Sequence, residues 1–236
     1  MKECVVVARL HREKMRWVLD RVVSGEFAAG QMLPREVDLA DSLAVSRGVA
    51  REVIRALEER GVVSVKHGRG ATVLAADRWD VLDPEVLAAV LAGPGSRDLV
   101  CELVECRLAL EPELARLAAS RVTDETLTEL TTALQSVAAT PPTAARDRGL
   151  AEIAFHRLLV RLAANRPAAN LIGPVLDAME SLAATLGRRR QSVGEHERIL
   201  AAMRARDADL AAAAVREHLQ RLADHLRNTR KRATSD

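Results

Sequence analysis

The stretch Ser46-Arg-Gly-Val-Ala-Arg-Glu-Val-Ile-Arg-Ala-Leu-Glu-Glu-Arg-Gly61 decides how the first part of this chain folds. Four aliphatic residues recur in it at helical spacing and form one apolar face: Val49, Val53, Ile54 and Leu57. Three arginines recur every four residues on another side: Arg47, Arg51 and Arg55. Ser46 is a strong N-cap and Gly61 a good helix stop. The stretch therefore predicts a short amphipathic helix whose arginine stripe suits the major groove of DNA.

The segments on either side of this helix predict a complete DNA-binding motif. Apolar residues at helical spacing indicate helices over 12–23 and 35–43, and the turn 44–46 joins the second to the arginine-striped helix. After Gly61, two β-branched runs, 62–65 and 71–74, flank a basic, glycine-rich segment. That pattern is typical of a β-hairpin, here a wing. Three helices and a hairpin make a winged helix-turn-helix over residues 11–75.

The overall charge of the chain is too small to indicate nucleic acid by itself. The formal net charge of the 236 residues is +2; residues 1–76 hold 13 Lys and Arg against 10 Asp and Glu, and the remainder 22 against 23. DNA affinity must therefore depend on where the charges lie. The three cysteines form no C-x-x-C pair, and no apolar run approaches the roughly 18 residues of a membrane span. We expect a cytoplasmic protein that makes no membrane contact.

The remainder of the chain is predicted to be helical. A linker over residues 77–96 contains a short helix that Asp83 caps and Pro84 begins. Counted from Pro84, the periodicity predicts about seven helices. Five of them lie at about 123–137, 147–164, 168–186, 194–205 and 208–228. The fold class is thus mainly α. We expect a DNA-binding domain at 1–76 and an all-α bundle at 97–236.

The first domain resembles the winged helix-turn-helix of the GntR family of bacterial transcription regulators. The residues that carry the resemblance are Gly25, Gly30, Leu33-Pro34-x-Glu36, Leu39-Ala40, Val45-Ser46-Arg47, Arg51-Glu52, Leu57, Gly61 and Gly68-x-Gly70. The resemblance implies that Ser46, Arg47 and Arg51 contact the major groove and that His67 and Gly68 place the wing in the minor groove. Three positions depart from the family pattern: Arg35, Val37 and Ala44 stand where Ser, Arg and Gly are usual. Arg35 is then a candidate phosphate contact in place of the arginine missing at 37.

The second domain resembles the FCD effector domain that defines the FadR subfamily of GntR regulators. The matching features are Glu105-x-Arg107-x-x-x-Glu111-Pro112, Ala118-Ala119, Phe155-His156, Ala163-x-Asn165-x-Pro167, Glu195-His196 and Glu217-His218. The resemblance implies a homodimer that binds a palindromic operator with one recognition helix per half-site.

Four residues of the second domain form a candidate metal site: Glu152, His156, His196 and His218. Glu152 and His156 are four residues apart and leave the same face of one helix, and the other two histidines lie on later helices. One carboxylate and three imidazoles suit Zn²⁺ or Ni²⁺ and leave positions open for an exogenous ligand. Taken alone, such a set is more often a surface pair with unconnected histidines. In FCD domains the same pattern is a metal site, with Asp more usual at the position of Glu152.

Arg107 is the candidate for binding an effector carboxylate, because its guanidinium offers two parallel hydrogen bonds. The alternative is an intrahelical pair with Glu111. These residues favour a metabolite-responsive transcription regulator, a repressor, whose effector is a small organic acid. The Trp79–Leu91 segment resembles that of sugar-acid regulators. The rival hypothesis, a metal-dependent enzyme, lacks a placed general base or nucleophile and leaves residues 11–75 unexplained, so we expect no enzyme.

Overall fold

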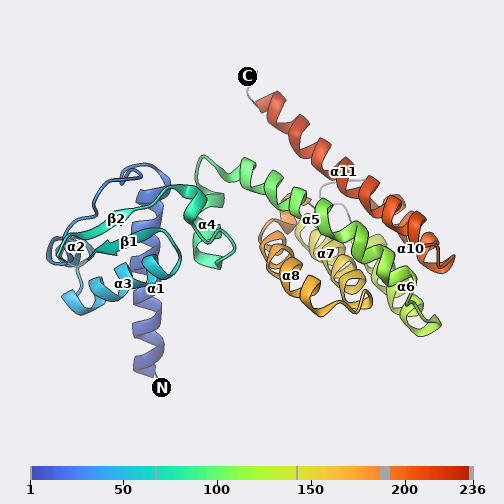
Figure 1. Cartoon of the computed structure of the whole chain (residues 1–236), viewed down its shortest axis with the longest axis horizontal. Helices are drawn as coiled ribbons and strands as arrows, with labels where there is room; N and C mark the ends of the chain where they lie inside the picture. The colour runs from blue at the N-terminus through green and yellow to red at the C-terminus, as the bar shows by residue number, and fades with distance from the viewer. Residues whose placement is uncertain (1, 67, 142, 187–191, 234–236) are drawn as a thin grey trace. The chain divides into compact units, whose positions relative to one another are not determined.

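The computed structural model describes residues 2–66, 68–141, 143–186 and 192–233 of the chain. It divides into two compact units, Met1–Leu99 and Val100–Asp236, coloured blue to green and green to red in Figure 1. Each unit has its own arrangement of helices and is described separately below.

The first unit is a winged helix-turn-helix, as the sequence predicts. Its helices are α1 (Lys2–Val23), α2 (Glu36–Leu43) and α3 (Arg47–Glu59), followed by strands β1 (Val63–Lys66) and β2 (Gly70–Val73). The strands pair antiparallel, with Val63 opposite Val73. The segment before α2 adds to the sheet, because the Gly30 amide donates to the Val73 carbonyl and the Leu33 amide to the Ala71 carbonyl, each at 2.8 Å. Strand β2 is therefore hydrogen-bonded along both edges, to β1 on one and to the segment before α2 on the other.

The helix cap and the helix stop predicted for residues 46–61 are both present. The Ser46 hydroxyl accepts a hydrogen bond from the Val49 amide at 3.4 Å and caps α3. Gly61 has φ +68, and a Cβ there would lie 2.3 Å from the Arg78 carbonyl oxygen, so only glycine fits. The apolar face of α3 is buried in one core with α1, α2 and the hairpin; its members there are Val53, Ile54, Ala56 and Leu57.

The segment expected to be a linker packs onto the first unit. It contains a short 3₁₀ turn, η1 (Ala76–Arg78), and the helix α4 (Pro84–Ala92). Asp83 caps α4 by accepting from two backbone amides, and its carboxylate lies 3.0 Å from Arg60 at the end of α3. Val86 and Ala89 of α4 belong to the same core as α1 and α3. The domain limits predicted from sequence, 1–76, 77–96 and 97–236, remain a prediction, but residues 77–92 lie with the DNA-binding unit.

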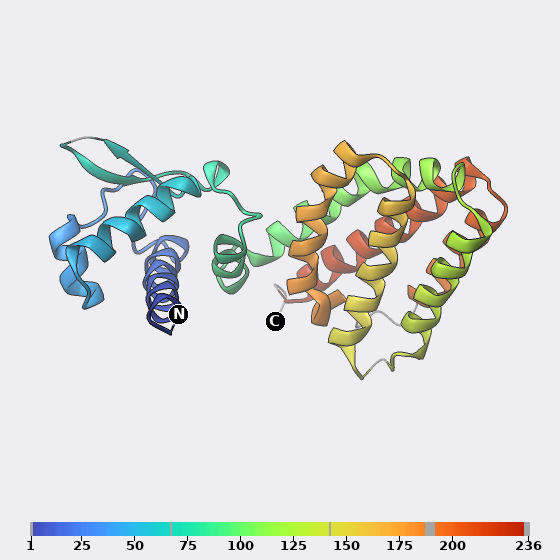
Figure 2. The same ribbon diagram turned by 90° about the horizontal axis from the view of Figure 1, so that it is seen from below.

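The second unit is all helical in the described part of the chain, which confirms the predicted fold class. Its helices are α5 (Ser96–Ala119), α6 (Asp124–Ala139), α7 (Ala145–Leu162), α8 (Arg166–Ser181), α9 (Ala183–Leu186), α10 (Ser192–Arg204) and α11 (Ala208–Ala233). Helix α7 packs between α6 and α8 (Figure 2), and α10 packs against α11 and α6. The single helix predicted over 168–186 is two helices, because α8 ends with Leu182 as its C-cap. None of the described helices is long and apolar enough to cross a membrane.

Gly149 lets α7 and α9 approach closely, and this contact generates a test of the packing. A Cβ at Gly149 would lie 2.0 Å from the Ala183 carbonyl oxygen, a backbone atom that cannot turn away. We expect Gly149→Ala to lower the free energy of unfolding by about 1–3 kcal/mol, measured by chemical denaturation. The matched control is Gly194→Ala in α10, where the nearest atom is the end of Glu197 at 3.9 Å. There the change should be neutral or stabilise by up to about 1 kcal/mol.

Candidate DNA interface and candidate metal centre

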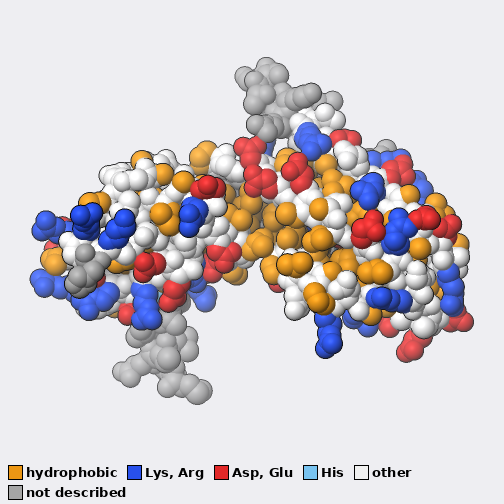
Figure 3. All heavy atoms as spheres, in the orientation of Figure 1, with side chains coloured by type: hydrophobic (Ala, Val, Ile, Leu, Met, Phe, Trp, Pro, Cys, Tyr) orange, Lys and Arg blue, Asp and Glu red, His pale blue; other side chains and the backbone are white. Residues whose placement is uncertain are grey.

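Helix α3 presents its arginines to solvent at one end of the first unit. Figure 3 shows Lys and Arg side chains gathered where Figure 1 places α2, α3 and the hairpin. Arg51 lies 3.2 Å from Glu36 and Arg55 lies 3.4 Å from Glu59, both as exposed pairs. Such pairs contribute little to stability, so a phosphate or a base edge can replace the carboxylate at small cost.

The other predicted DNA contacts that the structure describes also lie at the surface. Arg35 and Gly68 are exposed, and Gly68 has φ +73, a conformation that suits a tight wing tip. Val37, which stands where the family has arginine, is 39% exposed and offers no charge. His67 lies outside the described residues. The structure thus brings Arg35, Ser46, Arg47 and Arg51 to the exposed surface of the helix-turn-helix, and their role in DNA binding remains a prediction.

The three predicted histidines meet inside the second unit. His156 comes from α7, His196 from α10 and His218 from α11. One ring nitrogen of each lies within 4.8 Å of the others, and the side chains are at most 3% exposed. Phe155 packs edge-on against His196, with ring centroids 4.8 Å apart, and gives the cluster an apolar wall. Residues far apart in the sequence therefore form one buried group of imidazoles.

Two buried carboxylates fix how two of these imidazoles are oriented. His156 Nδ1 lies 2.7 Å from Glu111 Oε2, and His218 Nδ1 lies 2.8 Å from Glu195 Oε2. A carboxylate that accepts from Nδ1 leaves the lone pair of the imidazole on Nε2, and the contact between Glu195 and His218 suits this tautomer. The two Nε2 atoms face one another at 3.1 Å.

This donor set fits a divalent metal ion. Two facing lone pairs repel unless a cation or a proton lies between them. Nitrogens bound to one tetrahedral zinc ion lie about 3.3 Å apart, close to the Nε2 separation here. Imidazoles whose other nitrogen donates to a carboxylate are the usual ligands of zinc and nickel. Three histidines would supply the protein ligands and leave further coordination positions for a small molecule.

The electrostatics of the cluster keep His156 in the form that binds metal. Burial lowers the pKa of His156 below its ordinary value, although the Glu111 carboxylate opposes the shift. Burial would raise the pKa of Glu111, but the Arg107 guanidinium and the contact with His156 outweigh it and hold that pKa far below its usual range. At neutral pH the pair is therefore a carboxylate beside a neutral imidazole, the form of histidine that can bind a metal.

Glu152 and Arg107 occupy different places from the histidine cluster. Glu152 is buried and lies 3.5 Å from Arg148, and it is not one of the three residues whose ligand atoms meet. Its role as a fourth ligand remains a prediction. Arg107 is 2% exposed and pairs with Glu111, the alternative that the sequence left open. Its binding of an effector carboxylate also remains a prediction.

Sequence reasoning did not assign a role to Glu111 or Glu195. Glu111 follows Arg107 by one helical turn, a spacing that predicts only an intrahelical pair. Glu195 stands next to His196, but its carboxylate faces His218 on another helix. The one signal available was that both belong to the motifs by which the second domain resembles FCD domains.

Comparison with known families identifies both units. The model of the bacterial regulatory proteins of the gntR family matches residues 16–73. The FCD domain model matches residues 102–221, half of the chain. The chain belongs to the GntR family. It carries the FCD domain that defines the FadR-type architecture, as the sequence predicts.

The relatives of this GntR protein are transcription regulators. It is 30% identical to the galactonate operon transcriptional repressor of Escherichia coli K12 over 81% of this chain and 85% of that protein. It is 28% identical to the Uxu operon transcriptional regulator of the same organism, over 96% and 90% of the two chains. Family and relatives thus identify a DNA-binding transcription regulator, and the enzyme hypothesis has no support.

A solved structure with the same fold is that of Lar, which controls expression of the agr system in Listeria monocytogenes. The TM-score is 0.63 and the identity 17%, over 92% of this chain and 96% of that one. At this identity the likeness concerns the fold alone.

The histidine cluster generates a test by metal analysis. His196→Ala removes one of three imidazoles, and we expect the purified variant to lose the bound divalent metal, measured by elemental analysis after dialysis. His225→Ala is the matched control, because that histidine is exposed on α11, the helix that carries His218. Equal metal content in the wild type and His196→Ala would contradict the site.

Proposed function

We propose that this protein is a metabolite-responsive repressor whose FCD domain binds a divalent metal ion and, through it, a small carboxylate. The observation that carries the proposal is the histidine cluster: three buried imidazoles from three helices, two of which bring their Nε2 atoms within 3.1 Å of each other. Bound there, the metal would supply a Lewis acid with open positions for a carboxylate oxygen. A winged helix-turn-helix on the same chain would convert binding of that ligand into a change in DNA affinity.

A sugar acid is the effector class that we propose. The galactonate operon repressor is the relative named after such an acid, and the Trp79–Leu91 segment resembles that of sugar-acid regulators. An aldonate carries one carboxylate and several hydroxyl groups, and such hard oxygen donors can occupy open positions on zinc or nickel. Arg107 lies behind Glu111 at the same site and would meet the carboxylate if that pair opened.

We propose that helix α5 transmits a conformational change at the metal centre to the DNA-binding unit. It carries Glu111, which contacts His156, and its first residues, 96–99, belong to the first unit. A ligand that shifts α5 at the metal centre would therefore move its beginning as well. In a homodimer bound to a palindrome, such a shift changes the spacing of the two recognition helices. The DNA target places this proposed activity in the cytoplasm.

The DNA interface is tested by removing its exposed arginines. We expect Arg47→Ala with Arg51→Ala to abolish specific operator binding, because each good base contact contributes about 1–3 kcal/mol of discrimination. Genomic footprinting would supply the operator, and fluorescence anisotropy at several salt concentrations would measure its affinity. The salt slope should also fall by about one for each phosphate that the variant no longer binds.

Arg12→Ala is the matched control for this experiment. Arg12 is a 73% exposed arginine of the same unit that lies on α1 and pairs with Glu85 of α4. Its loss should leave operator affinity unchanged. Wild-type affinity in the double variant would refute the assignment of α3 as the recognition helix.

A further inference from the structure

The imidazole of His156 is the end of a chain of charged contacts that begins at an arginine. Arg107 and Glu111 lie one turn apart on α5, and the guanidinium pairs with the carboxylate through two nitrogens. The second oxygen of the same carboxylate lies 2.7 Å from His156 Nδ1 on α7. All three side chains are at most 3% exposed. A buried carboxylate needs such pairing, because otherwise it would take up a proton and no longer accept from the imidazole.

His218 is held by the same three residue types in the same order. Arg221 and His218 both lie on α11, and Arg221 Nη1 lies 3.6 Å from Glu195 Oε1 on α10. The other oxygen of Glu195 accepts from His218 Nδ1 at 2.8 Å. In both chains one carboxylate contacts an arginine and a histidine at once, although Arg107 reaches both oxygens of Glu111 and the contact of Arg221 is with one oxygen of Glu195. The two chains converge, because their Nε2 atoms are the pair that face one another.

We propose that Glu111 and Glu195 are the positioning residues of the metal centre, each anchored by its arginine. The proposal rests on the proposed function, since it assumes that the histidines bind metal. A carboxylate on Nδ1 fixes the tautomer, holds the ring plane and raises the basicity of Nε2. Two such carboxylates, from α5 and α10, aim two imidazoles at one point. Arg107 in this role acts on metal binding through Glu111, before any effector is present.

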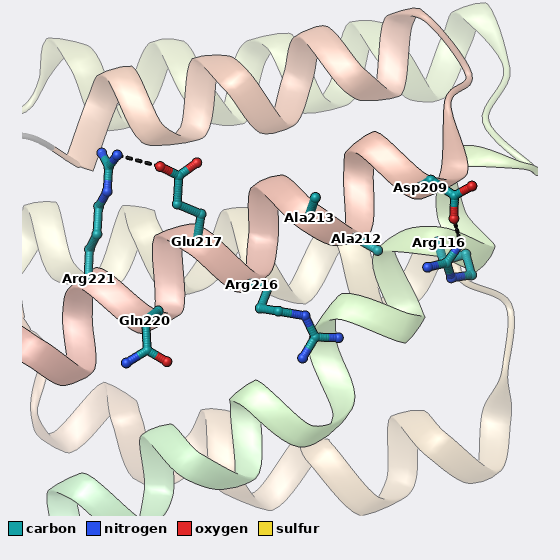
Figure 4. A pocket seen from close by; sticks show the side chains of 8 residues that line it. All are labelled: Arg116, Asp209, Ala212, Ala213, Arg216, Glu217, Gln220 and Arg221. Atoms are coloured by element: carbon teal, nitrogen blue, oxygen red, sulfur yellow. Dashed lines mark hydrogen bonds and ion pairs between the residues drawn. The ribbon is translucent and has the colours of Figure 1, made fainter.

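The two Arg–Glu–His relays, Arg107–Glu111–His156 and Arg221–Glu195–His218, differ in how far their arginines are exposed to solvent. Arg107 is buried, whereas the side chain of Arg221 is 44% exposed. Arg221 lines an open hollow together with Arg216 and Gln220 of α11 and Arg116 of α5, and it also pairs with Glu217 there (Figure 4). Arg221 is thus shared between a surface carboxylate and the buried Glu195. The second relay therefore extends from the histidine cluster to the protein surface, where Arg221 is accessible to solvent.

The test is a Co²⁺ titration of the full chain after removal of bound metal, followed by visible absorption and by competition with a chelator of known affinity. We expect Glu195→Ala to weaken Co²⁺ binding by about 10- to 100-fold and to change the d–d bands, because His218 loses its fixed orientation. Glu195→Gln, whose amide oxygen can still accept from Nδ1, should recover part of the affinity. Arg221→Ala should weaken binding by a smaller factor.

Arg216→Ala is the matched control, because Arg216 lines the same hollow on the same helix and pairs with Glu113, 3.8 Å away, instead of with Glu195. It should bind Co²⁺ as the wild type does. Circular dichroism of each variant verifies its fold. If Glu195→Ala does not fold, the near-isosteric Glu195→Gln decides the matter: its d–d bands should differ from those of the wild type.

Two results would overturn the relays: wild-type affinity and bands in every Glu195 variant that folds, or an equal loss in Arg216→Ala and Arg221→Ala. His196→Ala in the same titration separates this failure from that of the proposed function. If His196→Ala loses Co²⁺ while the relay variants keep it, the metal centre is supported and the positioning role of the relays is refuted. If His196→Ala binds Co²⁺ as tightly as the wild type, or the wild type binds none, both are refuted.

Discussion

The second unit depends on one arrangement, the two imidazole Nε2 atoms that face each other at 3.1 Å with a buried carboxylate behind each ring. Burying so many polar groups is costly unless each is paired. Here the pairs run from arginine to glutamate to histidine, and the last group in each chain has a lone pair to offer. A divalent cation placed between the lone pairs would complete both chains. This arrangement gives the interior of a helical bundle the donor groups of a metal site.

The helices of the bundle are arranged so that this polar interior is possible. His156 is brought to the centre by α7, which the α9 backbone approaches closely at Gly149. Glu111 comes from α5, Glu195 from α10 and His218 from α11, so four helices contribute to one cluster. A metal bound to these histidines would therefore be linked to side chains from all four helices. Because α5 begins in the DNA-binding unit, it is the element through which we propose that the effector acts.

Sequence predicted the local structure well and the shared polar contacts poorly. The cap at Ser46, the stop at Gly61 and the hairpin were all readable, because each depends on a few neighbouring residues. The histidine cluster was predicted through the resemblance to FCD domains. The roles of Glu111 and Glu195 were not, because each carboxylate meets a histidine on another helix and spacing along one chain segment does not show that contact. The packing of α4 on the first unit was missed for the same reason.

The most direct test of the metal centre is a crystal structure with X-ray data collected at the absorption edge of the metal that co-purifies with the protein. We predict one anomalous peak within bonding distance of His156, His196 and His218, with the carboxylates of Glu111 and Glu195 still on the Nδ1 atoms of the first and last. An anomalous peak elsewhere, or none in protein that contains stoichiometric metal, would contradict the metal centre.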